Sequence, residues 1–144
     1  MAVVSEYRRR IEWGDCDPAR IVFYPNYFAW FDDATWRLFA KVGLTPDVLV
    51  DQYRFAGMPI GEAKAKFSGP SRFFEEIVIE SHVAAWRDKS FDVVHQIKNA
   101  GLLVVEGMET RIWCEPHPDD PKRLKARPVP RAIVEKLSGS PSRL

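Results

Sequence analysis

The sequence predicts an α+β protein with one long helix near the N-terminus and an antiparallel sheet after it. Apolar side chains recur at helical spacing over residues 26–42, which is the longest amphipathic stretch of the chain. Most of residues 60–113 instead has the alternation of strands, and the segments 90–98 and 102–113 favour a hairpin across Asn99-Ala100-Gly101. A helix followed by consecutive strands is the order typical of an α+β fold.

The composition is that of an ordinary globular protein. The 144 residues suffice for a single domain over 1–144, with a proline-rich C-terminal extension from about residue 115. A hydrophobic content of 46% with 28% charged residues excludes a disordered chain, and the net charge of +1 favours neither nucleic acid nor a membrane as partner. Two cysteines, Cys16 and Cys114, and the lack of an apolar signal segment predict a cytoplasmic protein.

The remaining elements follow from alternation and from signals at helix ends. Residues 4–13 alternate as a strand with one wholly charged face. Pro25 suits the first turn of the long helix, and Gly43 suits its C-terminal cap. The other expected elements are a short helix at 45–54, strands at 60–67 and 74–85, and a last helix at 130–137.

Asp32 has an unusual position in the long helix. The apolar side of that helix is predicted to hold Phe28, Phe31, Thr35, Leu38, Phe39 and Val42. Asp32 falls about 40° from Phe28, at the edge of this stripe, whereas Asp33 occupies the opposite, solvated side. A charge at such an edge costs free energy unless it is paired. Either Asp32 turns outward or pairs with an arginine, or it faces a ligand, and we favour the ligand.

The chemically most suggestive stretch is the acidic loop of residues 14–20, which leads into the long helix. It brings the carboxylates Asp15 and Asp17 close to a helix N-terminus, where backbone N–H groups lack intrahelical partners. A carboxylate beside such donors is the arrangement that acyl-transfer hydrolysis requires. Because Pro18 holds Asp17 extended, Asp17 is the better placed of the two to project. From the residues alone, an acidic turn that merely caps a helix is the more common alternative.

Other familiar kinds of site are not indicated. His82, His95, His117 and the two cysteines lack metal-ligand spacing, and Cys16 lies between two aspartates that disfavour its thiolate. The sequence has no nucleophile elbow, P-loop or dinucleotide fingerprint. We therefore expect no cofactor and no metal, and among the usual catalytic groups carboxylates remain.

The turn Trp86-Arg87-Asp88-Lys89-Ser90 is a second candidate site. It places two cations between consecutive strands, where they would suit a phosphate-bearing ligand. A solvated charged turn explains the same residues without any ligand.

Three stretches of the N-terminal third carry a specific resemblance. They are Gly14-Asp15-Cys16-Asp17-Pro18-Ala19, Ile21-Val22-Phe23-Tyr24-Pro25-Asn26-Tyr27 and Trp30-Phe31-Asp32. They closely resemble the hot-dog-fold acyl-CoA thioesterases of the 4-hydroxybenzoyl-CoA thioesterase family, and the similarity extends over roughly residues 6–113. A related group of short-acyl thioesterases has His where this chain has Pro25, so the chain is more similar to the aromatic-acyl branch. Hot-dog dehydratases use a different His/Glu site, which the sequence does not indicate.

The resemblance implies a long helix wrapped by an antiparallel sheet, in a homodimer or a dimer of dimers (a homotetramer) with sites between subunits. It implies that Asp17 is the catalytic carboxylate, as nucleophile or general base, and that the Tyr24 backbone N–H polarises the thioester carbonyl. Asp32 would reach a polar ring substituent, and Arg87 and Lys89 would meet the phosphates of coenzyme A.

The implied function is hydrolysis of an aromatic acyl-CoA such as 4-hydroxybenzoyl-CoA. The alternatives are a short-chain aliphatic or hydroxyacyl-CoA thioesterase and a non-catalytic acyl-CoA-binding module. Two residues depart from the family. Arg20 stands where the family usually has Gly, so the loop is either altered or gains a ligand contact. Asp88 interrupts a turn that is more uniformly basic in relatives, which weakens the expected phosphate site.

Overall fold

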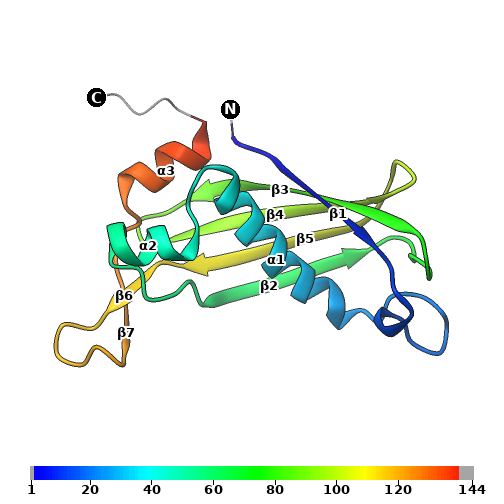
Figure 1. Ribbon diagram of the computed structural model, residues 1–144, viewed down its shortest axis with the longest axis horizontal. Helices are drawn as coiled ribbons and strands as arrows, with labels where there is room; N and C mark the ends of the chain where they lie inside the picture. Colours follow the sequence, from blue (N-terminus) through cyan, green and yellow to red (C-terminus); the bar gives the residue numbers. More distant parts are fainter. Residues whose placement is uncertain (1, 140–144) are drawn as a thin grey trace.

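The computed structural model describes residues 2–139, which form three α-helices, one short 3₁₀ helix and seven strands (Figure 1). In chain order they are β1 (Ser5–Arg10), η1 (Trp13–Asp15), α1 (Pro25–Lys41), α2 (Pro46–Tyr53), β2 (Ile60–Phe67), β3 (Glu76–Trp86), β4 (Ser90–Asn99), β5 (Leu102–Ile112), β6 (Cys114–Pro116), β7 (Leu124–Ala126) and α3 (Arg131–Ser138). The α+β prediction is confirmed.

The main sheet has five antiparallel strands in the order β1-β3-β4-β5-β2, and α1 crosses one face of it diagonally (Figure 1). The predicted hairpin between β4 and β5 is present. Ala100 and Gly101 both adopt positive φ, at 51° and 81°, which is the backbone that a tight hairpin turn requires. The order places β1 and β2, the first two strands of the chain, at the two edges of the sheet.

The rotation of α1 differs slightly from the prediction. Its buried residues are Tyr27, Trp30, Phe31, Ala34, Thr35, Leu38 and Phe39. Phe28 and Val42, expected in the core, are only half-buried. The reason is that the Phe31 ring packs directly against Gly107 of β5. A Cβ atom on residue 107 would overlap that ring. This close approach lets the helix axis come down onto the sheet and fixes which side faces inward.

Two strands begin or end at residues other than those predicted. The first strand stops at Arg10, and Trp13 lies exposed in η1, where its ring meets the edge of Phe73 at 5.3 Å. The chain turns there because the Glu12 N–H donates to the Asp15 carboxylate at 2.9 Å instead of continuing the ladder. The third strand begins at Glu76 rather than residue 74, since Phe74 has a φ of 68°, which no strand accommodates.

The C-terminal part returns to the sheet. The hairpin of β6 and β7 was not predicted from the sequence, because each strand has only three residues. Helix α3 buries Ile133 and Leu137 in the same core cluster as Phe39, Phe91 and Trp113. Its predicted cap Gly139 is left-handed at a φ of 72°. The last five residues of the proline-rich extension, with Pro141, lie outside the described residues.

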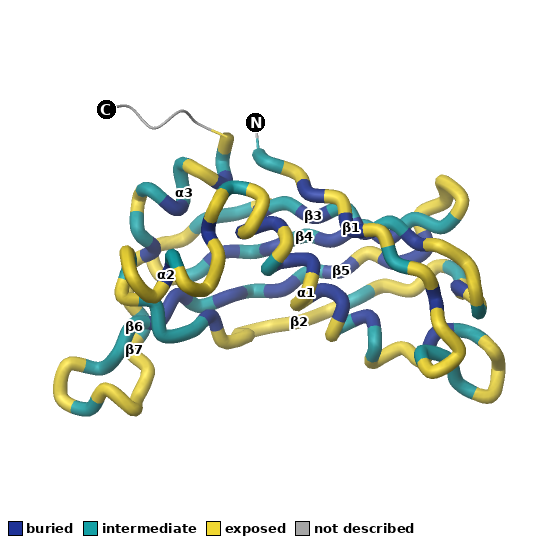
Figure 2. Tube along the Cα trace, viewed as in Figure 1, coloured by how far each residue is buried: buried dark blue, intermediate teal, exposed yellow. Residues whose placement is uncertain are grey.

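Strand β2 is exposed along almost its whole length (Figure 2). Within the described part of the chain it pairs with β5 on one side only, so its other side presents unpaired backbone groups there. Within residues 2–139, no helix is both long and apolar enough to cross a membrane.

Candidate functional site

The acidic loop is a tight reverse turn held by its own backbone. The Asp17 N–H donates to the Ile21 carbonyl at 3.0 Å, and the Arg20 N–H donates to the Asp17 carbonyl at 2.8 Å. The Val22 N–H then donates to the carbonyl of Ser71 at 2.9 Å, which ties the loop to the segment before β3. The position of Asp17 is therefore fixed by contacts on both sides of it.

The two loop aspartates have different surroundings. The Asp15 carboxylate accepts hydrogen bonds from the Glu12 N–H at 2.9 Å and from the Arg9 guanidinium at 3.3 Å, so both of its oxygens are engaged. In Asp17, Oδ1 accepts the Ala19 N–H at 2.8 Å, while Oδ2 has no partner among residues 2–139. Asp17 thus has a carboxylate oxygen without a partner among the described residues, and Asp15 does not.

The start of α1 offers one free donor beside this loop. Pro25 has no N–H, and the N–H groups of Asn26 and Tyr27 donate to the Phe23 and Tyr24 carbonyls. The Tyr24 N–H has no partner within the described part of the chain. The Asn26 side chain donates to the Asp15 carbonyl at 2.8 Å, and this bond links the helix start to the loop. The loop with the Asp17 carboxylate and the helix start with the unpaired Tyr24 N–H are thereby joined by hydrogen bonds.

Arg20 retains the loop geometry that a glycine would favour. Its φ is 66°, in the left-handed region, and the Arg20 N–H still closes the turn onto Asp17. Arg20 therefore adopts the conformation that a glycine would favour, and a residue with a Cβ atom is strained in this region.

Asp32 pairs with an arginine. Its Oδ1 accepts from the Arg111 guanidinium at 2.7 Å, and its Oδ2 has no partner among residues 2–139. The Asp32 side chain is 52% exposed, whereas that of Arg111 is 5% exposed. The two sequence interpretations are thus compatible, because Asp32 is paired through one oxygen and open to a ligand through the other.

Arg111 belongs to a buried polar network that was not predicted from the sequence. Arg111 donates to Glu109 Oε2 at 2.8 Å, and Glu109 Oε1 lies 2.8 Å from His95 Nε2 and accepts from the Thr35 hydroxyl at 2.7 Å. His95 Nδ1 in turn lies 2.6 Å from the Ser81 hydroxyl. The only available signal was the presence of polar residues at inward-facing strand positions, and this signal does not show which of them meet.

Burial by itself would raise the pKa of Glu109. The hydrogen bonds from His95 and Thr35 and the charge of Arg111 outweigh it, so the pKa of Glu109 is lowered from its ordinary value. The His95 ring is stacked on Phe31 and is fully buried, and Glu109 is 3% exposed. The pair is therefore buried away from solvent in this chain.

The basic turn between β3 and β4 is less free than the sequence suggested. Both terminal nitrogens of Arg87 bond to the Asp92 carboxylate, and its Nε donates to the Ser90 hydroxyl at 2.9 Å. Asp92, rather than the neighbouring Asp88, is the partner that offsets the charge of Arg87, and this pair lowers the pKa of Asp92. The exposed side chain of Lys89 makes no ion pair within the described residues.

The acidic loop and the basic turn lie at opposite ends of the sheet (Figure 1). Arg10, just before the loop, pairs with Glu76 at the start of β3, whereas the turn follows the other end of that strand at Trp86. Eleven residues at ~3.3 Å each give β3 a length of about 35 Å. One chain therefore does not bring Asp17 together with Arg87 and Lys89.

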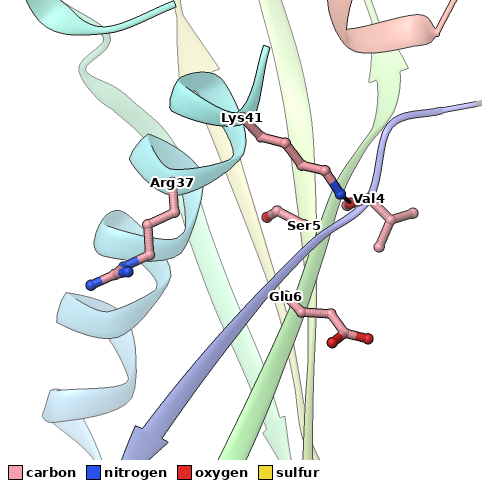
Figure 3. A pocket seen from close by; sticks show the side chains of 5 residues that line it. All are labelled: Val4, Ser5, Glu6, Arg37 and Lys41. Atoms are coloured by element: carbon pink, nitrogen blue, oxygen red, sulfur yellow. Dashed lines mark hydrogen bonds between the residues drawn. The ribbon is translucent and has the colours of Figure 1, made fainter. Parts of the chain in front are cut away.

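A large surface hollow lies away from all of these groups. It has a volume of about 520 Å³ and is lined by Val4, Ser5, Glu6, Arg37 and Lys41, between β1 and the C-terminal half of α1 (Figure 3). Lys41 is turned toward the Val4 carbonyl and donates to it, and Arg37 stacks on Tyr7. The Glu6 carboxylate and the negative end of the α1 dipole both oppose an anion there. No group of three or more potential metal ligands occurs within residues 2–139.

Two curated proteins are similar to this chain. The chain is 35% identical over 144 residues to the 4-hydroxybenzoyl-CoA thioesterase of Pseudomonas sp. (strain CBS-3), covering 96% of this chain and 100% of that protein. It is 27% identical over 121 residues to the 1,4-dihydroxy-2-naphthoyl-CoA hydrolase of Trichodesmium erythraeum (strain IMS101), covering 83% and 86%.

Solved structures show the same relationship. A D17N mutant of 4-hydroxybenzoyl-CoA thioesterase in complex with 4-hydroxybenzoyl-CoA superposes with a TM-score of 0.85 at 35% identity, covering 94% of this chain and 99% of that one. A gentisyl-coenzyme A thioesterase superposes with a TM-score of 0.77 at 31% identity, covering 92% and 98%. The helix laid across a five-stranded antiparallel sheet is thus the expected hot-dog fold. The family model of the thioesterase-like superfamily matches residues 11–137, and the chain belongs to that superfamily.

Proposed function

We propose that this protein hydrolyses an aromatic acyl-CoA thioester, with 4-hydroxybenzoyl-CoA as the preferred substrate, to the free acid and coenzyme A. The observation that carries the proposal is that the loop with the free Asp17 Oδ2 is hydrogen-bonded to the start of α1, where the Tyr24 N–H has no partner among the described residues. The relatives with 31–35% identity act on hydroxylated aromatic acyl groups, which supports the choice of substrate.

Asp17 is the proposed catalytic carboxylate. As a general base it would take a proton from water while the water oxygen adds to the thioester carbonyl; as a nucleophile it would form an acyl anhydride that water then cleaves. In either case the Tyr24 N–H would stabilise the negative charge on the carbonyl oxygen. Coenzyme A leaves as its thiolate and is then protonated. No step requires a redox group or a metal.

Asp32 is the proposed contact for the ring hydroxyl of the substrate. Its free Oδ2 is an acceptor at the exposed edge of α1, and a 4-hydroxyl group is a donor that an aliphatic acyl chain lacks. Lys89 is the proposed main contact for the coenzyme A phosphates, with Arg87 joining only if its pair with Asp92 opens.

We further propose a homodimer or dimer of dimers in which each site combines residues of two subunits. The separation of about 35 Å between the acidic loop and the basic turn supports this, because one coenzyme A molecule would meet both only if they came from different chains. The uncovered edge of β2 is a suitable surface for pairing. We also propose that residues 1–144 form one domain and that the protein is cytoplasmic, for which the unpaired Cys16 and Cys114 are support.

The decisive experiment compares thiol release from a panel of acyl-CoA substrates by the natural protein, Asp17→Asn and Asp15→Asn. We expect 4-hydroxybenzoyl-CoA to be hydrolysed with the highest kcat/KM, and kcat to fall by ~10³ or more in Asp17→Asn while substrate still binds. Asp15→Asn is the matched control, because it removes a carboxylate that holds the loop and should mainly lower stability.

Each alternative function has its own outcome in this experiment. Near-normal turnover by a folded Asp17→Asn protein would contradict the assignment of Asp17. A preference for short aliphatic thioesters would favour a short-chain thioesterase instead. Binding of acyl-CoA without any turnover by the natural protein would indicate a binding module.

A further inference from the structure

Arg111 connects the buried network to the exposed Asp32. Its guanidinium donates to three acceptors, which are Asp32 Oδ1 at 2.7 Å, Glu109 Oε2 at 2.8 Å and the Met58 carbonyl at 3.2 Å. These acceptors belong to α1, to β5 and to the loop before β2. Arg111 itself is 4% exposed, so it cannot contact a substrate directly.

The hydrogen bond from Arg111 determines how Asp32 presents its carboxylate. An aspartate on an exposed helix surface normally samples several rotamers, but here Oδ1 is bonded to a donor that the core holds in place. The second oxygen, Oδ2, has no partner among residues 2–139 and lies on a side chain that is 52% exposed. One oxygen is therefore anchored and the other is available to accept a hydrogen bond.

The network behind Arg111 holds it in place in turn. Glu109 offsets its charge and is itself bonded by Thr35 of α1 and by His95 of β4. His95 is fixed by the Ser81 hydroxyl on one side and by stacking on Phe31 on the other. Arg111 Nε is buried without a partner among the described residues, but the other polar groups of this network are bonded to one another. Such a connected network resists movement, since a shift would leave further buried polar groups without partners.

From this geometry we propose that Arg111 is a positioning residue for acyl-group specificity, acting through Asp32. Arg111 holds the Asp32 carboxylate so that Oδ2 meets the ring hydroxyl of the substrate, and Glu109 and His95 keep Arg111 in that position. This inference rests on the proposed function, in which Asp32 recognises the hydroxyl.

The test measures kcat/KM for 4-hydroxybenzoyl-CoA and benzoyl-CoA in Arg111→Lys, Asp32→Asn and the double variant. A lysine keeps the positive charge beside Glu109, but its single ammonium group cannot span the three acceptors. We expect the ratio of the two kcat/KM values to fall about tenfold in Arg111→Lys, through the hydroxylated substrate, with benzoyl-CoA changing less than about twofold. In the Asp32→Asn background, Arg111→Lys should lower the ratio no further, because it acts through Asp32.

Arg37→Lys is the matched control, because it makes the same arginine-to-lysine change at a residue of α1. The Arg37 guanidinium stacks on Tyr7 and does not bond Asp32. It should leave the ratio unchanged. If circular dichroism shows that Arg111→Lys is unfolded, the variant Arg111→Gln/Glu109→Gln answers the same question. It removes both charges of the buried pair, leaves no lone buried charge, and should lower the ratio by a similar factor.

The outcomes separate the two proposals. A ratio that collapses in Asp32→Asn but is retained in folded Arg111→Lys, or in the folded double glutamine variant, overturns the role of Arg111 and leaves the proposed function intact. A ratio that is retained in Asp32→Asn overturns recognition of the hydroxyl by Asp32 and the role of Arg111 with it. Loss of turnover of both substrates to the same degree in Arg111→Lys would show a merely structural role and also overturn the proposal.

Discussion

Arg20 shows how a single residue balances loop geometry against backbone strain. It occupies the left-handed region at a φ of 66° in the turn that carries Asp17, where glycine avoids the clash of a Cβ atom. We expect Arg20→Gly to raise the free energy of unfolding by about 1 kcal/mol, measured by denaturant titration. Arg20→Ala retains the Cβ strain and should give no such gain. A loss of stability in Arg20→Gly would show that the arginine side chain makes contacts that outweigh the strain.

Gly107 is the residue on which the contact between α1 and the sheet depends. A methyl group there would overlap the Phe31 ring, which is fully buried and stacked on His95 and so cannot move aside. We expect Gly107→Ala to lower the free energy of unfolding by about 2–3 kcal/mol, as measured by thermal or denaturant unfolding. Gly14→Ala is the control, because a Cβ at Gly14 meets no atom within 4 Å. A neutral Gly107→Ala would mean that α1 shifts easily over β5.

At the scale of elements, the turn between β3 and β4 carries two cationic side chains, one with an ion-pair partner among residues 2–139 and one without. Arg87 is committed to Asp92, whereas Lys89 is exposed and makes no ion pair within the described residues. We expect Lys89→Ala to raise KM for coenzyme A thioesters about fivefold with little change in kcat, because it removes a surface charge contact present in both ground and transition states. Steady-state kinetics measures both constants.

Two comparisons make this result specific. A short thioester without the nucleotide should be hydrolysed equally well by Lys89→Ala and by the natural protein. Lys98→Ala serves as the matched variant, since Lys98 lies toward the far end of β4 and pairs with Glu80. Equal effects on both thioesters would show that the turn is structural.

For the whole molecule, the buried network predicts how stability depends on pH. The pKa of Glu109 is lowered in the folded state from an ordinary value of 4.5, so the folded protein holds this proton less tightly than the unfolded chain does. The stability contributed by ionised Glu109 is therefore present above pH 4.5 and is lost as the pH falls through the lower folded pKa.

The measurement is the free energy of unfolding from about pH 7 down to about pH 3, compared between the natural protein and Glu109→Gln. The glutamine variant should be less stable at neutral pH, since Arg111 loses its buried partner, but its stability should decline less steeply on acidification. Asp92, whose pKa is also lowered, is present in both proteins and cancels in the comparison. Parallel curves would mean that Glu109 does not carry the acid sensitivity.

The amino-acid sequence by itself determined the parts of this protein that depend on neighbouring residues. The helix at Pro25–Lys41 follows from apolar spacing and end signals, and the β4–β5 hairpin follows from alternation around Ala100 and Gly101. The Asp17 turn could be predicted for the same reason, because hydrogen bonds between residues two to four apart form it. Conformations that depend only on neighbouring residues can therefore be predicted from a short stretch of sequence.

Only the tertiary structure decided which distant groups meet. Asp32 and Arg111 are 79 residues apart in the chain, and Thr35 and Glu109 are 74 apart, so neither spacing nor periodicity indicates their contact. Strand register joins His95 and Glu109, and the length of β3 separates Asp17 from Lys89. Pairing across a sheet is selected by the packing of the whole core, which no single segment encodes.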